Sequence, residues 1–214
     1  ERTPAGQGAS EHPFRFPVQW VCRPREATDP LLHDYRGLAG QVAAGTLAVG
    51  EEIVVLPSGH RSTVTAIEVG GVPREHAVAG DSVMIRLADD LDVGRGEMLV
   101  RADQSAPALT RSVEADLVWL DPAPLALRRT YLLRHTTREV QARVEAIEWN
   151  LDVATLERVP AHELTMNDIA RVRVKLAQPI AADPYEVLRD TGSFLLIDPA
   201  TWDTVAAGMI RGTQ

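Results

Sequence analysis

The sequence has very little cysteine and no long apolar run. Cys22 is its single cysteine, so no disulfide can form within the chain, and a reducing, cytoplasmic setting is expected. Cys22 stands in an apolar segment, which favours a packed side chain over a nucleophile. No apolar run is long enough to cross a bilayer, and residues 1–11 lack the apolar core of a signal peptide. The sequence therefore predicts no membrane association.

Lysine is almost absent as well. Lys175 is the only lysine among 22 basic residues, and the formal net charge is −8. Nucleic-acid binding needs a basic face, so nucleic acid is an unlikely partner on this composition. The phosphate-binding loop G-x-x-x-x-G-K-[ST] is not found, and neither is the guanine-reading N-K-x-D. We therefore predict no GTP-binding residue within the 214 residues.

Groupings that would indicate catalysis or metal binding are also missing from the sequence. Asp89, Asp90 and Asp92 lie close together but lack the spacing of a calcium loop, which favours a solvated turn. No G-x-S-x-G nucleophile elbow occurs. The histidines show no ligand-like spacing; they are His12, His33, His60, His76, His135 and His162. We predict no catalytic and no metal-binding residue.

Alternating apolar residues and turn residues dominate what is present. Hydrophobic residues make up 45% of the chain, enough for a core, and no long amphipathic helix or internal repeat is found. The predicted class is all-β, with two tandem antiparallel β-barrels. We assign residues 1–11 to a linker or tail, 12–103 to the first barrel, 104–110 to a linker and 111–214 to the second barrel. Strands are predicted at 14–21, 38–44, 52–56, 62–69, 83–87, 91–100 (a turn leading into a closing strand), 113–120, 129–136, 139–149, 171–176, 194–198 and 204–210.

Two of these strands carry detailed predictions. In the first strand, Phe14, Phe16, Val18 and Trp20 are expected on one face, and Pro17 indicates an edge strand or a bulge. In the segment 139–149 the apolar phase switches after residue 146, which predicts a β-bulge there. The polar connection 152–168 is expected to hold at most one short helical turn.

The segment 171–176, R-V-R-V-K-L, alternates strictly. Its valines and leucine are expected to point inward and Arg171, Arg173 and Lys175 outward. This outward face could meet an acidic partner or nucleic acid, but we favour a solvated strand face.

Residues 35–56 form the most distinctive stretch, with glycines at 37, 40, 45 and 50 between short apolar runs. Glycine tolerates positive φ, so this spacing predicts strands separated by tight turns, one of them at 44–46. The pattern R-G-x-x-G-x-V-x-x-G-x-L-x-x-G-E-x-I-x-V resembles the second domain of translation-type GTPases, the β-barrel that follows their nucleotide-binding domain.

Motifs in the second half of the chain indicate which relative of the translation-type GTPases it resembles. It contains L-D-P-A-P-L (120–125), I-E-W-N-L-D-V-A-T-L-E (147–157), L-T-M-N-D-I-A-R-V (164–172), P-I-A-A-D-P-Y (179–185), R-D-T-G-S-F-L-L-I-D (189–198) and T-V-A-A-G-M-I (204–210). With F-R-F-P-V-Q-W-V and R-G-L-A-G in the first half, these resemble the GTPase subunits of bacterial sulfate adenylyltransferase, including those fused to adenylylsulfate kinase. The resemblance covers only their second and third domains, and the loop 26–33 is longer than usual.

The resemblance implies a function for the parent subunit rather than for this fragment alone. Such subunits hydrolyse GTP and couple it to adenylyl transfer from ATP to sulfate, which gives adenylylsulfate and pyrophosphate with Mg²⁺. The barrels would dock a separate catalytic subunit and the subunit's own GTPase domain, and would relay the nucleotide state. The fragment alone is not expected to be an enzyme or to hold a cofactor.

Three alternatives stay open at this point. One is a translation-factor-like module that binds RNA or protein. Another is a stand-alone hydrolase, for which the sequence offers no constellation of catalytic residues. The polar cluster 189–192 could contact a partner. We favour a hairpin turn there, with Asp190 bonded to backbone and Gly192 at positive φ.

Overall fold

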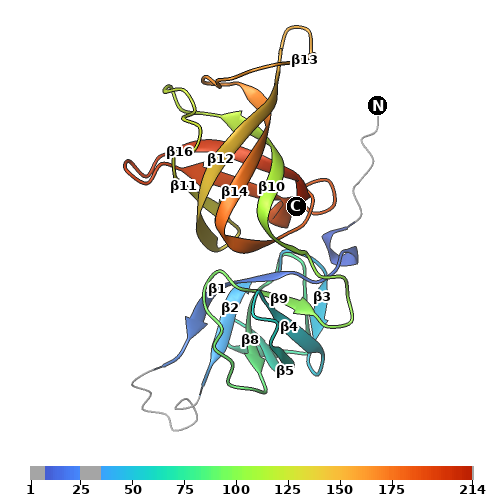
Figure 1. The fold of residues 1–214 in the computed structure, drawn as a ribbon. Coiled ribbons are helices and arrows are strands. Elements are labelled where there is room, and N and C mark those ends of the chain that lie inside the picture. Colours follow the sequence, from blue (N-terminus) through green and yellow to red (C-terminus); the bar gives the residue numbers. More distant parts are fainter. Residues whose placement is uncertain (1–7, 25–34, 214) are drawn as a thin grey trace. The chain divides into compact units, whose positions relative to one another are not determined.

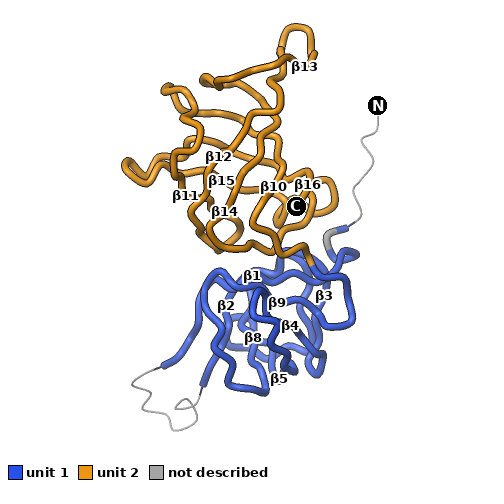
Figure 2. Tube along the Cα trace, in the orientation of Figure 1, with its two compact units in different colours: residues 1–106 blue, residues 107–214 orange. Residues whose placement is uncertain are grey.

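The computed structural model describes residues 8–24 and 35–213, so the predicted long loop 26–33 and residues 1–7 of the predicted tail lie outside the described part. The chain divides into two compact units, residues 1–106 and 107–214 (Figure 2). Helix is confined, in the described residues, to a 3-10 turn at Ala9–Glu11 and the four-residue α1 (Arg189–Gly192). The predicted all-β class is confirmed, because every other regular element is a strand.

The described residues of unit 1 form nine short strands (Figure 1). They are β1 (Phe16–Cys22), β2 (Gly37–Gln41), β3 (Thr46–Ala48), β4 (Glu52–Leu56), β5 (Arg61–Val69), β6 (Val72–Arg74), β7 (His76–Val78), β8 (Ser82–Leu87) and β9 (Met98–Arg101). Hydrogen bonding orders seven of them β4-β9-β1-β2-β8-β5-β6, and β4 also pairs with β5. Six strands therefore close into an antiparallel barrel, while β3 and β7 pair separately.

The first strand shows where alternation misled the prediction. Phe14, Phe16 and Val18 are fully buried, but Trp20 is 60% exposed. The register between β1 and β2 shifts between Val18 and Trp20, and this bulge turns the indole to the other face. Of the two roles predicted from Pro17, the bulge is observed next to it, whereas β1 lies between β9 and β2 rather than at an edge.

Unit 2 contains seven strands, several of them long. They are β10 (Ala108–Trp119), β11 (Tyr131–His135), β12 (Arg138–Leu151), β13 (Arg158–Val159), β14 (Ile169–Ala182), β15 (Ser193–Ile197) and β16 (Thr204–Thr213). Their order is β11-β15-β16-β10-β14-β12-β13, and β11 also pairs with β12. The first six close into a barrel, and β13 extends β12 as a projecting hairpin (Figure 1). Residues 108–110, predicted as linker, belong to β10.

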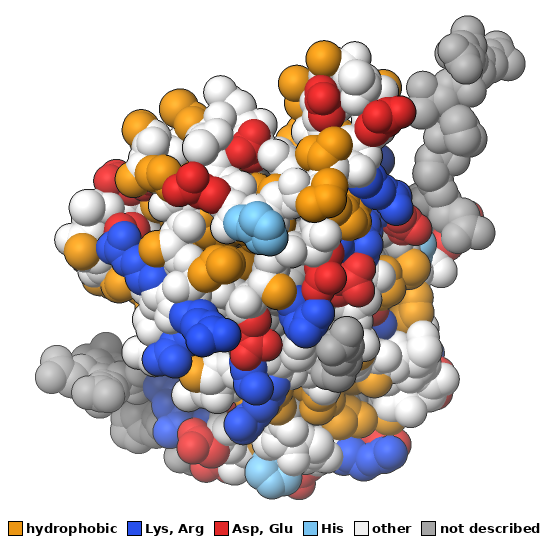
Figure 3. All heavy atoms as spheres, turned by 45° about the horizontal axis from the view of Figure 1, so that its top comes forward, with side chains coloured by type: hydrophobic (Ala, Val, Ile, Leu, Met, Phe, Trp, Pro, Cys, Tyr) orange, Lys and Arg blue, Asp and Glu red, His pale blue; other side chains and the backbone are white. Residues whose placement is uncertain are grey.

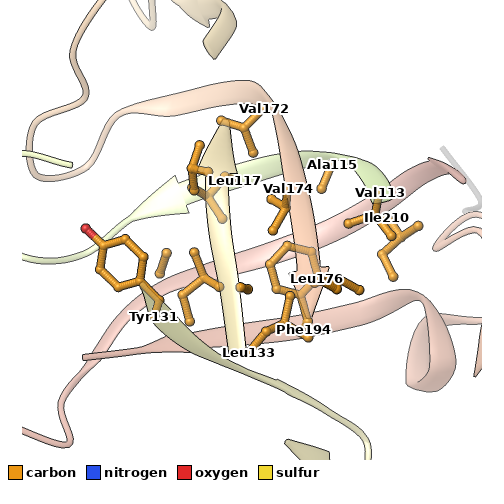
Figure 4. Close-up of a cluster of buried hydrophobic side chains, with 14 of the residues drawn as sticks. Val113, Ala115, Leu117, Tyr131, Leu133, Val172, Val174, Leu176, Phe194 and Ile210 are labelled. Atoms are coloured by element: carbon orange, nitrogen blue, oxygen red, sulfur yellow. The ribbon is translucent and has the colours of Figure 1, made fainter. Parts of the chain in front are cut away.

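The core of unit 2 follows the predicted alternation. Val172, Val174 and Leu176 of β14 point inward, as predicted, beside Leu117 of β10 and Phe194 of β15 (Figure 4). The predicted bulge in β12 is also confirmed, since its register against β14 shifts between residues 144 and 146. The connection 152–168 contains no helical turn, which the prediction allowed, and holds the short strand β13, which was not predicted.

Candidate functional site

The polar cluster 189–192 forms the helical turn α1, so the predicted hairpin was wrong. Gly192 is not among the glycines at positive φ. A Cβ at this position would come within 2.4 Å of Tyr185 Cα and 2.6 Å of Tyr185 N. The glycine is required for close approach of two backbone segments rather than for a left-handed conformation.

Two buried polar residues hold α1: Asp183, just after the end of β14, and His135 of β11. Thr191 Oγ1 donates a 2.6 Å hydrogen bond to Asp183 Oδ2, and His135 Nε2 lies 2.7 Å from the Thr191 carbonyl oxygen. A carbonyl can only accept, so Nε2 of His135 carries the proton. Burial lowers the pKa of His135 and keeps the ring neutral, while the hydrogen bond to Thr191 acts in the opposite direction.

These three residues include types used in hydrolases, but their arrangement is different. The Thr191 hydroxyl bonds to the carboxylate and not to the imidazole, and all three side chains belong to buried residues. In a nucleophilic triad the imidazole must reach the hydroxyl. The arrangement therefore orders the connection between β14 and β15 and is structural.

The outward face of β14 is the second place where sequence indicated a site. Arg171 Nε lies 2.6 Å from Asp116 Oδ1, and its Nη1 lies 2.7 Å from Glu114 Oε1. On the other side of Asp116, Arg211 Nε lies 2.7 Å from Oδ2 and its Nη1 pairs with Glu186. Carboxylates of the same barrel therefore already pair with this arginine face, so it does not need an acidic partner molecule.

Asp116 is the centre of this network. Burial alone would raise the pKa of Asp116, but the hydrogen bonds from Arg171 and Arg211 outweigh it and lower the pKa. Arg173 pairs with Glu148, and Lys175 lies 3.9 Å from Glu145. Arg171, Arg173 and Lys175 on this face of β14 thus each have a carboxylate neighbour. Figure 3 likewise shows acidic and basic side chains next to one another on one face of the molecule. Such a face neutralises its own cations and is poorly suited to nucleic-acid phosphates.

The aspartate cluster at 89–92 borders a groove of about 770 Å³ in unit 1. Asp90 Oδ1 accepts hydrogen bonds from Arg36 at 2.5 Å and Arg23 at 3.0 Å, and Asp89 accepts one from Ser62 at 2.7 Å. The aspartates thus hold arginines and a hydroxyl. Within residues 8–24 and 35–213, no group of three or more histidine, cysteine, aspartate or glutamate side chains is arranged to hold a metal ion.

Tyr35 forms the wall of the same groove. Its hydroxyl donates to Glu68 Oε2 at 3.2 Å, and Arg86 lies 4.9 Å above its ring. Burial, followed by the charge of Glu68, raises the pKa of Tyr35 to about 12. The phenol therefore stays protonated at neutral pH and acts as a hydrogen-bond donor that fixes this wall.

Comparison with known proteins shows what the chain is similar to. Residues 112–211 match the family described as "GTP-eEF1A C-terminal domain-like". The chain is 42% identical over 199 residues to "Sulfate adenylyltransferase subunit 1" of Aeromonas salmonicida, which covers 93% of the chain and 41% of the relative. It is 42% identical over 198 residues to "Bifunctional enzyme CysN/CysC" of Mycobacterium tuberculosis, covering 92% of the chain and 32% of the relative.

A solved structure shows the same fold at lower identity. The structure titled "Crystal Structure Analysis of sup35 complexed with GDP" matches with a TM-score of 0.82 and 20% identity, over 96% of the chain and 48% of that protein. This likeness confirms the predicted tandem-barrel fold. The chain spans less than half of the length of the relatives it matches. Among the described residues, no helix is long and apolar enough to cross a membrane.

Proposed function

We propose that this chain, which is related over nearly its whole length to part of sulfate adenylyltransferase subunit 1, is the non-catalytic β-barrel region of a GTP-hydrolysing subunit. The parent protein would couple GTP hydrolysis to the transfer of an adenylyl group from ATP to sulfate. The products would be adenylylsulfate and pyrophosphate. Nucleotides and Mg²⁺ would bind to other parts of the assembly, in the cytoplasm.

One observation carries the proposal: the similarity to subunit 1, at 39–40% identity, extends over 92–98% of the chain and therefore includes both barrels. The name "subunit 1" implies a second subunit, and we assign adenylyl transfer to it. The barrels contribute two surfaces, one toward the nucleotide-binding domain of the parent and one toward the second subunit. Coupling requires that the two nucleotide states differ in their affinity for that second subunit.

An activity assay tests the coupling role. Adenylylsulfate formation is measured with the catalytic subunit plus either the complete GTPase subunit or its nucleotide-binding domain alone. We expect GTP stimulation only with the complete subunit, because the barrels transmit the nucleotide state. Full stimulation by the nucleotide-binding domain alone would reduce the barrels to a scaffold.

The translation-factor-like fold makes RNA binding the second candidate to exclude. The net charge of −8 and the paired arginines Arg171 and Arg211 disfavour it. A gel-shift titration with single-stranded and double-stranded RNA at low and moderate salt is expected to show no saturable complex. A complex that weakens steeply with salt would favour the RNA-binding reading instead.

A further inference from the structure

One end of the barrel in unit 2 gathers three long connections. Because neighbouring strands are antiparallel, the connections β10–β11 (120–130), β12–β14 (152–168) and β15–β16 (198–203) all emerge at the same end. They also contact one another: Leu125 N donates to Leu164 O at 2.9 Å, and Arg129 pairs with Asp198 at 2.7 Å. We call these three connections the loop end of unit 2.

The loop end exposes large apolar side chains to an unusual degree. Six of them are between 38% and 73% exposed: Leu120, Leu127, Val153, Leu156, Met166 and Trp202. At the opposite end, the connection between β14 and β15 exposes Val187, at 52%. In Figure 3, hydrophobic side chains gather beside acidic ones where the β13 hairpin projects at the top of the view. Apolar clusters of this kind mark interaction sites when polar residues surround them.

Two turns of the same design present the most exposed of these side chains. Residues 152–157 read D-V-A-T-L-E and residues 198–203 read D-P-A-T-W-D, a repeat of only six residues. In both turns the first backbone nitrogen donates to the sixth carbonyl at 2.9 Å. The fifth nitrogen donates to the first carbonyl, at 2.7 and 2.8 Å. The aspartate side chain accepts from the third nitrogen, at 2.8 and 2.9 Å.

The fifth residue of each turn is the one that faces solvent. Leu156 has φ 60° and is 73% exposed; Trp202 has φ 66° and is 67% exposed. Positive φ favours glycine and is disfavoured for a bulky side chain. The chain thus places a large apolar residue where folding prefers glycine and water prefers a polar group. Stability does not account for either residue, whereas contact with a partner does.

The charge around these side chains indicates the chemistry of the partner. The three connections carry seven carboxylates and three arginines, and one of those arginines, Arg129, is already paired with Asp198. Glu157, Glu163 and Asp203 are exposed around the apolar side chains. A complementary surface is apolar at its centre and basic at its rim.

We propose that the loop end of unit 2 is the docking surface for a protein with an apolar contact patch rimmed by lysine or arginine. In the function proposed above, this partner is the adenylyl-transferring subunit, and the inference rests on that function. Leu156 and Trp202 insert into the partner's apolar patch, while the acidic rim sets orientation and speeds encounter.

Glycine substitutions separate docking from folding. Binding of the 214-residue chain to the adenylyl-transferring subunit is measured by calorimetry, together with thermal unfolding of each variant. We expect L156G and W202G each to weaken binding by about tenfold or more, and the double variant further, with no fall in melting temperature. The matched control V187G changes an exposed apolar residue at the opposite end of the same barrel and should bind like the unchanged chain.

The outcomes distinguish this surface from the broader proposal. If the unchanged chain does not bind the subunit at all, the proposed docking function fails and this inference fails with it. If the unchanged chain binds and the double variant binds equally well, only the loop end is refuted. Loss of self-association in the double variant, seen by sedimentation, would assign the surface to a second copy. Loss of binding to a separately added nucleotide-binding domain would assign it to the rest of the subunit. Either result would overturn the proposal.

Discussion

Gly45 in unit 1 allows a conformational cost and a steric cost to be measured separately. Its φ is +74°, and a Cβ would lie 2.6 Å from both Cα and N of Phe14 and 2.7 Å from the carbonyl oxygen of His12. Those neighbours are backbone atoms, so they cannot move aside by a change of rotamer. Gly50 is the matched control, because its φ is +91° but no atom lies within 4 Å of its Cβ position.

The structure sets the expected magnitudes. A left-handed conformation costs a non-glycine residue about 1–2 kcal/mol, which is the whole expected loss for Gly50→Ala. Gly45→Ala adds the cost of forcing a methyl group into a packed backbone, about 1–3 kcal/mol more. The expected loss for Gly45→Ala is therefore about 2–5 kcal/mol, a large part of the stability of a small domain.

Urea denaturation followed by far-ultraviolet circular dichroism measures both free energies of unfolding. Hydrogen–deuterium exchange with peptide resolution then shows whether the loss falls within residues 1–106, the unit that contains both glycines. If Gly45→Ala destabilises the protein no more than Gly50→Ala, the steric reasoning is wrong and this turn is able to relax.

Four further predictions concern unit 2 and ligand binding. Gly192→Ala should destabilise unit 2 by about 1–3 kcal/mol, because its Cβ would lie 2.4 Å from a backbone atom. Gly212→Ala, whose Cβ would have its nearest atom at 4.0 Å, should be nearly neutral. Equal losses in the two variants would contradict this. The pKa of His135 is lowered in the folded state. Below about pH 6.5 the unfolded chain therefore binds more protons than the folded chain, and the free energy of unfolding should fall as the pH drops from about 6.5 toward the folded pKa. Urea unfolding between pH 7.5 and 5.5 should show this fall, and His135→Gln should lessen it; an identical pH dependence in both proteins would argue against it. Asp116→Asn should cost about 1–3 kcal/mol in the same urea assay, because it removes the carboxylate that two partly buried guanidinium groups share. An unchanged midpoint would show that Glu114 and Glu186 suffice as partners of the two arginines. Calorimetry with GTP and Mg²⁺ should give no saturable heat, since the chain has no phosphate-binding loop, and a micromolar site would refute that expectation.

The longer strands could be predicted from sequence because alternation and turn residues act locally, whereas the short strands β3, β6, β7 and β13 were not predicted. The strand Glu52–Leu56 was predicted with the same bounds that β4 has, and the phase switch after residue 146 identified the bulge in β12. Long motifs in both halves indicated the resemblance to sulfate adenylyltransferase subunits from the sequence alone. These features depend on neighbours within a few residues, which a sequence displays directly.

The closure of each barrel and the roles of its polar residues were decided only by tertiary structure. The rings close through the β4–β5 and β11–β12 pairings. α1 is held in part by His135, which is 56 residues from Thr191 along the chain. The same holds for Asp116, whose two arginines are 55 and 95 residues away along the chain.

The two D-x-A-T turns show what the sequence determines and what only the tertiary structure decides. Their letters stand in the sequence, and so does the apolar fifth residue. Only the fold shows that Leu156 and Trp202 share one end of a barrel and that both face water at positive φ. Local order follows from the alternation of side chains along the backbone, whereas exposure depends on which strands close the ring around the core.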